Sequence, residues 1–264
     1  MSSTTGRPVT ATKRLCIILP SYNDARIERA IRSIRNFDDI GVVRIVVIDG
    51  GSHDDIRELI RGCLSSDDIF ISEPDEGIFD AMNKGLDACD TEYVGYLGSD
   101  DMFTGAVASS QVVAALREHD LVVANVAFFR DGYVTRITHA LPSRLGLMKL
   151  GLHNPHFATF GRAALLKSER FRLDLRGSDI DYFVRVFEKR PQVATLNVVA
   201  TLQEEGGFSN GSSFAILRTN LELISMYSSY TNWILGPVAV AVKLSYKSLS
   251  KAYYRIFRVP VAAR

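Results

Sequence analysis

The stretch YVGYLGSDD, Tyr93 to Asp101, joins an apolar run to two adjacent carboxylates. Its first five residues are typical of a buried β-strand, because they are mostly apolar or aromatic and a glycine turn follows them. Adjacent aspartates repel each other unless a positive charge lies close to both. A strand that ends in this way indicates a fold whose strand ends hold a cation or a charged ligand.

Composition places the chain among ordinary globular proteins. It has 264 residues, 47% hydrophobic and 23% charged, with a formal net charge of +1. This length suffices for one large or two small domains, and the charge gives no reason to expect a nucleic-acid partner. Because no zinc-type spacing is present, we expect Cys16, Cys63 and Cys89 to be reduced structural thiols in a cytoplasmic protein. No run reaches the roughly 18 apolar residues of a membrane span.

Strand and helix patterns alternate through the first half of the chain. Apolar runs predict strands at 15–19, 42–48, 68–72 and 93–97. Helical spacing predicts helices after Asp24, with Asn23 or Asp24 as the N-cap, and at 56–63, 78–88 and 107–116. This order implies right-handed crossovers and a mostly parallel sheet. From 121 onward the alternation is less regular.

Polar segments follow all four predicted strands: PSYND, DGGSHDD, SEPDEG and GSDD. One such segment would be an ordinary turn, since turns favour these residue types. The carboxyl ends of parallel strands, however, lie along one edge of the sheet, where ligands of open α/β folds bind. Four in succession therefore indicate a binding site.

The segments IILPSYNDARIERAIRSI, VVIDGGSHDDI, DEGIFDAMNKGLDA and YLGSDD resemble, in order and spacing, the signatures of family-2 glycosyltransferases with the GT-A fold. The resemblance covers about residues 14 to 211 and extends to bacterial polysaccharide and glycolipid enzymes, such as those for colanic acid and mycobacterial phenolic glycolipids. It implies a Rossmann-like α/β fold with a mostly parallel central sheet flanked by helices. We expect a disordered N-terminus at 1–13, the GT-A domain at 14–215 and a helical basic tail at 216–264.

The resemblance also implies a site for a nucleotide-sugar donor. Asp49 is expected to accept a hydrogen bond from a uracil N–H, although it could instead cap the following helix. Lys84 is expected to meet phosphate, although a solvated lysine is the alternative. The complete set expected around the donor is Pro20, Tyr22, Asn23, Asp49, Asp75, Gly77, Asn83, Lys84, Ser99, Asp100 and His153.

Asp100 and Asp101 are expected to hold Mn²⁺ or Mg²⁺ against the donor pyrophosphate, because a divalent cation neutralises the charge of that leaving group. The family motif is usually Asp-x-Asp, and here Gly98 stands at its first position. Asp100 is then the direct ligand. Asp101 is a second or water-mediated ligand, or accepts a hydrogen bond from a sugar hydroxyl. The alternative is that the pair caps a helix beginning at Met102.

The stretch GSDIDYFVR matches the family motif that carries the catalytic base. The match puts the base at Asp179, with Asp181 as the alternative, although the family often has Glu where this chain has Ser178. Both carboxylates also lie at a predicted helix N-terminus, where negative charge is favourable in any case.

Two further stretches have weaker signals. LHNPHFATFGR contains His153 and His156, and we expect His153 near the donor phosphate or the acceptor, with a buried structural histidine as the alternative. Two histidines alone do not predict a metal site. In EEGGFSNGSS, Gly206 and Gly207 could hinge a loop that closes over the donor, or form an ordinary surface turn.

The tail beyond Leu223 contains no Asp or Glu. Lys243, Lys247, Lys251 and Arg255 recur every four residues, with apolar and aromatic residues between them. This pattern predicts a helix lying on an anionic membrane surface. Packing on the protein's own core is the alternative.

Taken together, these patterns predict an inverting, metal-dependent glycosyltransferase. The expected donor is a UDP-sugar, and the expected acceptor is a hydroxyl of a glycolipid or lipid-linked saccharide. We expect the protein in the cytoplasm, peripheral on the inner membrane, with oligomerisation left open. The alternatives are a nucleotidyltransferase, for which PSYNDAR lacks the Gly- and Lys-rich phosphate loop, and a non-catalytic module that binds nucleotide sugar or membrane.

Overall fold

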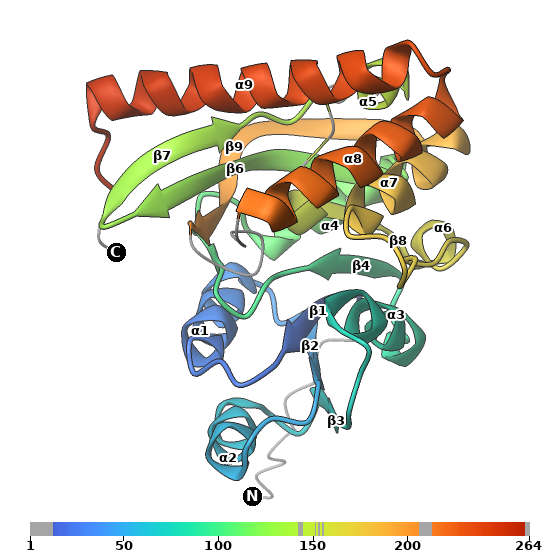
Figure 1. The fold of residues 1–264 in the computed structure, drawn as a ribbon. Coiled ribbons are helices and arrows are strands. Elements are labelled where there is room, and N and C mark those ends of the chain that lie inside the picture. Colours follow the sequence, from blue (N-terminus) through green and yellow to red (C-terminus); the bar gives the residue numbers. More distant parts are fainter. Residues whose placement is uncertain are drawn as a thin grey trace, which may run out of the picture.

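The computed structural model describes residues 13–141, 145–150, 152, 154, 156–205 and 213–261, without the side chains of 147 and 213–218. Within these residues a nine-stranded mixed sheet runs through the molecule and helices cover it (Figure 1). The predicted disorder of 1–13 lies, except for its last residue, outside the described residues.

The first half of the chain forms the parallel part of the sheet. Its strands are β1 (Leu15–Ser21), β2 (Val43–Asp49), β3 (Ile69–Ser72) and β4 (Tyr93–Tyr96), in the spatial order β3-β2-β1-β4. All three neighbouring pairs are parallel. The predicted strands and the predicted shared edge are therefore confirmed.

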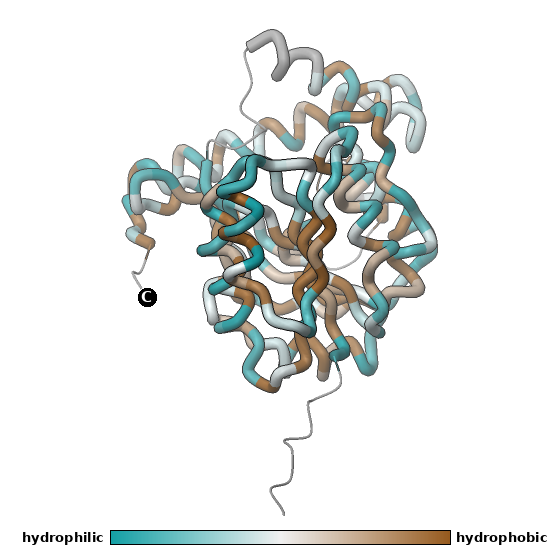
Figure 2. Tube along the Cα trace, turned by 90° about the horizontal axis from the view of Figure 1, so that it is seen from below, coloured by the Kyte–Doolittle hydropathy of each residue, from teal (hydrophilic) through white to brown (hydrophobic). Residues whose placement is uncertain are grey.

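Helices α1 (Ile27–Phe37), α2 (Asp54–Cys63), α3 (Ile78–Ala88) and α4 (Ser109–Glu118) connect or follow these strands. The strands are apolar on both sides because a core lies on each face of the sheet. Leu15, Ile17 and Leu19 pack with α1, whereas Cys16 and Ile18 pack with α3. Figure 2 shows these apolar strands in the middle and polar residues along the outer helices.

The start of α1 differs from the prediction. The helix begins at Ile27, and no side chain caps it. Asp24 instead accepts hydrogen bonds from the backbone and guanidinium of Arg26. This carboxylate is thereby held at the strand end.

The second half of the chain adds β5 (Met102–Phe103), β6 (Leu121–Arg130), β7 (Tyr133–Thr138), β8 (Thr159–Arg162) and β9 (Val193–Glu204). β8 runs antiparallel to both β4 and β6, and β9 runs parallel to β6. Met102 begins the short strand β5, which pairs with β9. The alternative of a helix starting at Met102 is therefore wrong.

Three short elements and one longer helix connect or flank these strands: α5 (Leu145–Lys149), the 3₁₀ turn η1 (His156–Ala158), α6 (Ala163–Leu166) and α7 (Ser178–Glu188). The apolar side of α7 is buried through Phe183, Val186 and Phe187, as its spacing predicts. That burial fixes the helix start, where the predicted catalytic base lies.

The tail forms α8 (Ser213–Tyr230) and α9 (Leu235–Phe257). α9 crosses the molecule beside β7 (Figure 1), and the hydroxyl of Ser250 lies 3.3 Å from the carbonyl oxygen of Ile137. Lys251 Nζ lies 2.8 Å from a carboxylate oxygen of Glu205. The basic stripe is thus partly neutralised by a distant acid. Among the described residues, none of the helices combines the length and apolar character that crossing a bilayer requires.

Candidate active site

The loops after β1, β2 and β4 are joined by side-chain hydrogen bonds. The backbone N–H of Asn23 donates to Ser52 Oγ at 2.7 Å, and the N–H of His53 donates to Asn23 Oδ1 at 2.9 Å. Ser99 Oγ donates to Asp24 Oδ2 at 3.0 Å. The structure therefore brings Asn23 and Ser99 to one edge. Asp24 was not among the predicted site residues.

Asp49 lies at the same edge but is completely buried. Its carboxylate accepts hydrogen bonds from the Ser52 N–H at 3.0 Å, the Ser52 hydroxyl and the Ser72 hydroxyl at 2.7 Å. It closes the turn after β2 and does not cap α2, whose N-cap position is His53. Contact with a uracil stays a prediction for Asp49. Nearby, Pro20 is buried in β1, whereas the ring of Tyr22 is 65% exposed at the strand end.

The loop after β3 approaches the turn after β2. A Cβ added at Gly50 would lie 2.6 Å from Asp75 Oδ2, so this position is closely approached. Asp75 accepts a hydrogen bond at 2.8 Å from the N–H of Gly77, whose φ of +112° favours glycine. Asp75 and Gly77 thus belong to the strand-end edge, as the sequence predicts.

Lys84 and Asn83 have structural partners. Lys84 Nζ donates to the Pro74 carbonyl at 3.1 Å and pairs with Glu73 at 3.0 Å, which fastens the loop after β3. The Asn83 side chain exchanges two hydrogen bonds of 2.9 Å with the backbone of Phe171. Donor contacts by these two residues therefore gain no support from the geometry.

The carboxylate pair after β4 converges on Gly98. A Cβ at Gly98 would lie 2.7 Å from Asp101 Oδ2 and 3.0 Å from Asp100 Oδ1. Asp101 is 2% exposed, and Gln203 Nε2 donates to it at 2.9 Å. Burial, and next the charge of Asp100, raise the pKa of Asp101 to about 7. Burial also raises the pKa of Asp100.

Two arginines around the start of α1 face this pair. Arg29 Nη2 donates to the Asp100 carbonyl at 2.9 Å and pairs with Glu204 at 3.0 Å. Arg26 Nη2 lies 3.8 Å from Asp100 Oδ2. Arg26, Arg29, Gln203 and Glu204 were missed from sequence, because their spacing along the chain gives no local pattern.

The donor atoms at Gly98 suit a hard divalent cation. Mg²⁺ bound beside a phosphorylated substrate commonly takes one or two carboxylates, with phosphate oxygens and water as the other ligands. Asp100 and Asp101 provide such a pair, and their oxygens face the same gap in front of Gly98. Over the described part of the chain there is no group of three or more His, Cys, Asp or Glu side chains that could hold a metal. The residues therefore fit a cation shared with a ligand.

Asp179 lies in the first turn of α7, 24% exposed, with its Oδ2 atom 3.3 Å from His156 Nδ1. The two C-terminal helices also approach it. Burial, and next the charge of Asp179, raise the pKa of Tyr227 on α8. The hydroxyl of Tyr227 is buried and has no hydrogen-bond partner among the described residues. Lys243 on α9 is half-buried and lies within electrostatic reach of the same carboxylate.

Asp181 differs sharply from Asp179, although both open the same helix. It is fully buried and bonds to Arg185 Nε at 2.9 Å, Arg172 Nη1 at 3.3 Å and the Tyr230 hydroxyl at 2.6 Å. These contacts tie α7 to α8 and to the segment before α7. Asp181 therefore has the surroundings of a structural carboxylate.

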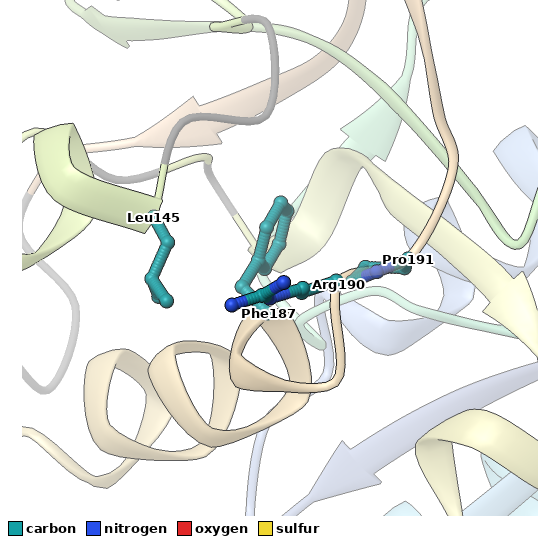
Figure 3. A pocket seen from close by; sticks show the side chains of 4 residues that line it. All are labelled: Leu145, Phe187, Arg190 and Pro191. Atoms are coloured by element: carbon teal, nitrogen blue, oxygen red, sulfur yellow. The ribbon is translucent and has the colours of Figure 1, made fainter.

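Three residues of the prediction lie outside the described residues: His153, Gly206 and Gly207. A cavity of about 140 Å³ is lined by Leu145, Phe187, Arg190 and Pro191 (Figure 3). It lies at the C-terminal end of α7, at the opposite end of the helix from Asp179. It contains none of the predicted site residues.

A family model described as Glycosyl transferase family 2 matches residues 16–170, which include β2 to β4, all of β1 except its first residue, and the Asp100–Asp101 pair. The chain belongs to glycosyl transferase family 2. Its members transfer sugars from nucleotide-sugar donors, so this chain is a glycosyltransferase. The predicted family is confirmed.

Two curated relatives of this chain are glycosyltransferases by their names. A PGL/p-HBAD biosynthesis glycosyltransferase of Mycobacterium bovis is 30% identical over 213 residues, 76% of this chain and 80% of the relative. The GalNAc(5)-diNAcBac-PP-undecaprenol beta-1,3-glucosyltransferase of Campylobacter jejuni is 23% identical over 189 residues, 67% of this chain and 60% of the relative.

Solved structures share the fold. S. aureus TarS 1-349 in complex with UDP-GlcNAc has a TM-score of 0.59 at 16% identity, over 90% of this chain and 74% of that one. Glucosyl-3-phosphoglycerate synthase from Mycobacterium tuberculosis, in complex with Mn²⁺, UDP and glucosyl-3-phosphoglycerate, has a TM-score of 0.52 at 19% identity, over 83% and 81%. These are GT-A glycosyltransferases, and the GT-A fold predicted from the sequence is confirmed.

Proposed function

We propose that the protein is an inverting, metal-dependent glycosyltransferase that moves a sugar from a UDP-sugar to a hydroxyl of a glycolipid or lipid-linked saccharide. The observation that carries this proposal is the strand-end edge. Four parallel strands end side by side there, and two carboxylates converge on Gly98. The UDP and Mn²⁺ complexes of the fold relatives support the donor and the cation.

On the donor side, Asp100 and Asp101 would hold Mn²⁺ or Mg²⁺, which when bound stabilises negative charge on the leaving diphosphate. Arg26 and Arg29 position this part of the site, because Arg29 fixes the Asp100 backbone and both arginines pair with Glu204. Preorganised charge of this kind stabilises the charge that develops as the sugar leaves.

On the acceptor side, Asp179 is the general base. It is partly exposed, whereas Asp181 is buried and its carboxylate already has three partners. Asp179 accepts the proton of the acceptor hydroxyl, whose oxygen attacks the anomeric carbon from the face opposite the diphosphate. His156 orients the Asp179 carboxylate from 3.3 Å. One base suffices for inversion, so the mechanism requires no covalent sugar–enzyme intermediate.

The lipid acceptor is supported by the relatives' names and by the outer face of α9. Leu249, Tyr253 and Ile256 on that face are 72%, 54% and 75% exposed, and the helix contains no acidic residue. Such a helix can lie in the interfacial layer of a bilayer. We propose that α9 rests on the cytoplasmic membrane surface through this apolar face, with the protein peripheral to the membrane.

The test is calorimetric titration with UDP-, GDP- and dTDP-sugars, with and without Mn²⁺. We expect Mn²⁺-dependent binding of a UDP-sugar, and loss of that dependence in Asp100→Asn with the melting temperature preserved. Unchanged Mn²⁺ dependence in the variant would refute the metal site. Binding without release of UDP in the presence of membrane lipid extract would favour a non-catalytic module. Release of pyrophosphate from UTP and a sugar phosphate would indicate a nucleotidyltransferase.

A further inference from the structure

A cluster of three cations lies between β7 and α9, and the proposed mechanism does not use it. Its members, the α9 cluster, are Arg136 on β7 and Lys243 and Lys247 on α9. The two lysines are one helical turn apart. The contacts of Tyr246 and Ser250 with the Ile137 carbonyl fix this part of α9 against the strand that carries Arg136.

Within the described residues, no ion pair joins Arg136, Lys243 or Lys247 to an acid. The remaining segments of the sequence contain no Asp or Glu. Glu205, which acts electrostatically on Arg136 and Lys247, already pairs with Lys251 at 2.8 Å and with Arg130 at 3.6 Å. Glu205 and Asp179 therefore offset the charge of the cluster only electrostatically, without a direct ion pair among the described residues.

The arginine is held in place but not neutralised. Its guanidinium carbon lies 3.5 Å from the centre of the Phe128 ring, and Nη1 donates to Thr138 Oγ1 at 2.7 Å. Its Nε atom is buried without a partner. Burial lowers the pKa of Arg136 to about 10, and burial followed by the charge of Arg136 lowers that of Lys247. Arg136 and Lys243 are half-buried, whereas Lys247 is exposed. Gathering like charges in this way costs stability unless an anion binds there.

One member of the α9 cluster, Lys243, interacts electrostatically with Asp179, the proposed base on the acceptor side of the site. Burial lowers the pKa of Lys243. The charge of Asp179 opposes this shift, whereas the charges of Lys247 and Arg136 lower the pKa further. Lys243 is thus within electrostatic reach of both the other two cations and the proposed base. An acceptor whose hydroxyl reaches Asp179 would therefore have the α9 cluster within electrostatic reach.

We propose that Arg136, Lys243 and Lys247 form an anion site for the phosphate or diphosphate group of the acceptor. This inference rests on the proposed function, and it narrows the acceptor to one that carries phosphate near the sugar hydroxyl. A phosphate oxygen can accept several charge-assisted hydrogen bonds from such donors. The diphosphate of a prenyl-linked saccharide has this chemistry, and a neutral glycolipid does not.

The experiment compares three probes in EDTA, which disables the proposed metal site: farnesyl diphosphate, farnesol and phosphatidylglycerol vesicles. The intact protein should bind farnesyl diphosphate at least tenfold more tightly than farnesol. Lys243→Gln and Lys247→Gln should each weaken diphosphate binding by about tenfold, a typical contribution for a hydrogen bond between charged groups. The control Arg255→Gln removes the same charge from an exposed position of the same helix and should keep the affinity.

Three results would overturn the inference: equal binding of farnesyl diphosphate and farnesol, unchanged affinity in both lysine variants, or an equal loss in Arg255→Gln. Dependence on Lys243 and Lys247 for vesicles alone would assign the anion to bilayer headgroups, and the acceptor assignment would be wrong. Mn²⁺-dependent UDP binding, measured on the same samples, reports separately on the proposed function. If Mn²⁺-dependent UDP binding were absent, the proposed function would be wrong, and diphosphate binding at the α9 cluster would then serve another function.

Discussion

Replacing each of the two aspartates of α7 by asparagine should affect a different property, activity for Asp179 and stability for Asp181. Asp179 is partly exposed beside His156, so Asp179→Asn removes a proton acceptor and little packing. Loss of a general base typically lowers the rate about 10²–10⁴-fold, which is about 3–5 kcal/mol of transition-state stabilisation. The melting temperature should change by less than about 2 °C, because exposed ion pairs contribute under about 1 kcal/mol.

Asp181→Asn should instead lower stability. The change removes the Asp181 carboxylate that pairs with Arg172 and one of the two acids that bond to Arg185. Breaking a buried pair on one side costs about 3–5 kcal/mol. The retained hydrogen bond to Tyr230 places the expected cost near the lower value, about 3 kcal/mol, or about 6–12 °C in melting temperature.

The assays are UDP release under donor saturation and differential scanning calorimetry on both variants, with Mn²⁺-dependent UDP binding as the control for an intact donor site. The reasoning is refuted if Asp181→Asn is inactive at unchanged stability, because the base would then be Asp181. Two active variants would place the base elsewhere.

Further predictions concern the donor site, the fold and the tail. Gly98→Ala should weaken Mn²⁺-dependent UDP binding by about tenfold, since the new methyl would meet Asp101 Oδ2 at 2.7 Å, and should leave metal-free UDP binding unchanged in the same titration. Asp68→Asn should lower the free energy of unfolding in urea by about 2 kcal/mol at pH 7. Burial raises the pKa of Asp68, but Arg35 and backbone N–H donors outweigh it, so the pKa is lowered overall. This stability is present above the unfolded value near 3.9 and is lost as the pH falls through the lower folded value, so the gap between wild type and variant should close in acid; a gap independent of pH would contradict it. Leu249→Lys with Ile256→Lys should reduce sedimentation with anionic vesicles despite the added positive charge, whereas increased sedimentation would mean that charge alone binds the tail.

The first half of the fold was predictable because its signals are local. β1 to β4 are mostly apolar runs, with Arg44 as an interruption in β2, and the helix after β1 has clear 3.6-residue spacing. Strand ends of a parallel sheet meet at one edge regardless of the remaining topology, so the candidate site followed from the same patterns.

The second half of the fold and the remaining site residues depend on contacts between segments that are distant in the sequence. Glu204 bonds to Arg29 across 175 residues, and the strand β5 has only two residues. Sequence periodicity therefore predicts neither the contact nor the strand. Asp179 and Asp181 have the same residue type and nearly the same place on α7, yet the first is partly exposed and the second is buried among partners supplied by other parts of the chain. Their difference arises from tertiary packing, which sequence spacing does not record.

The close contact between α8 and α9 is the point about which α9 could tilt. A Cβ at Gly236 would lie 1.9 Å from Ser228 Oγ and 2.7 Å from the Ile224 carbonyl, so the two helices meet there without room for a methyl group. α9 has 23 residues, or about 35 Å at about 1.5 Å per residue, so a tilt of about 10° at the joint would move its far end by about 6 Å. The same tilt would shift the α9 cluster by about 2–3 Å. The contact at Gly236 thus determines both the distance of the far end of α9 from a membrane surface and the distance of its lysines from Asp179.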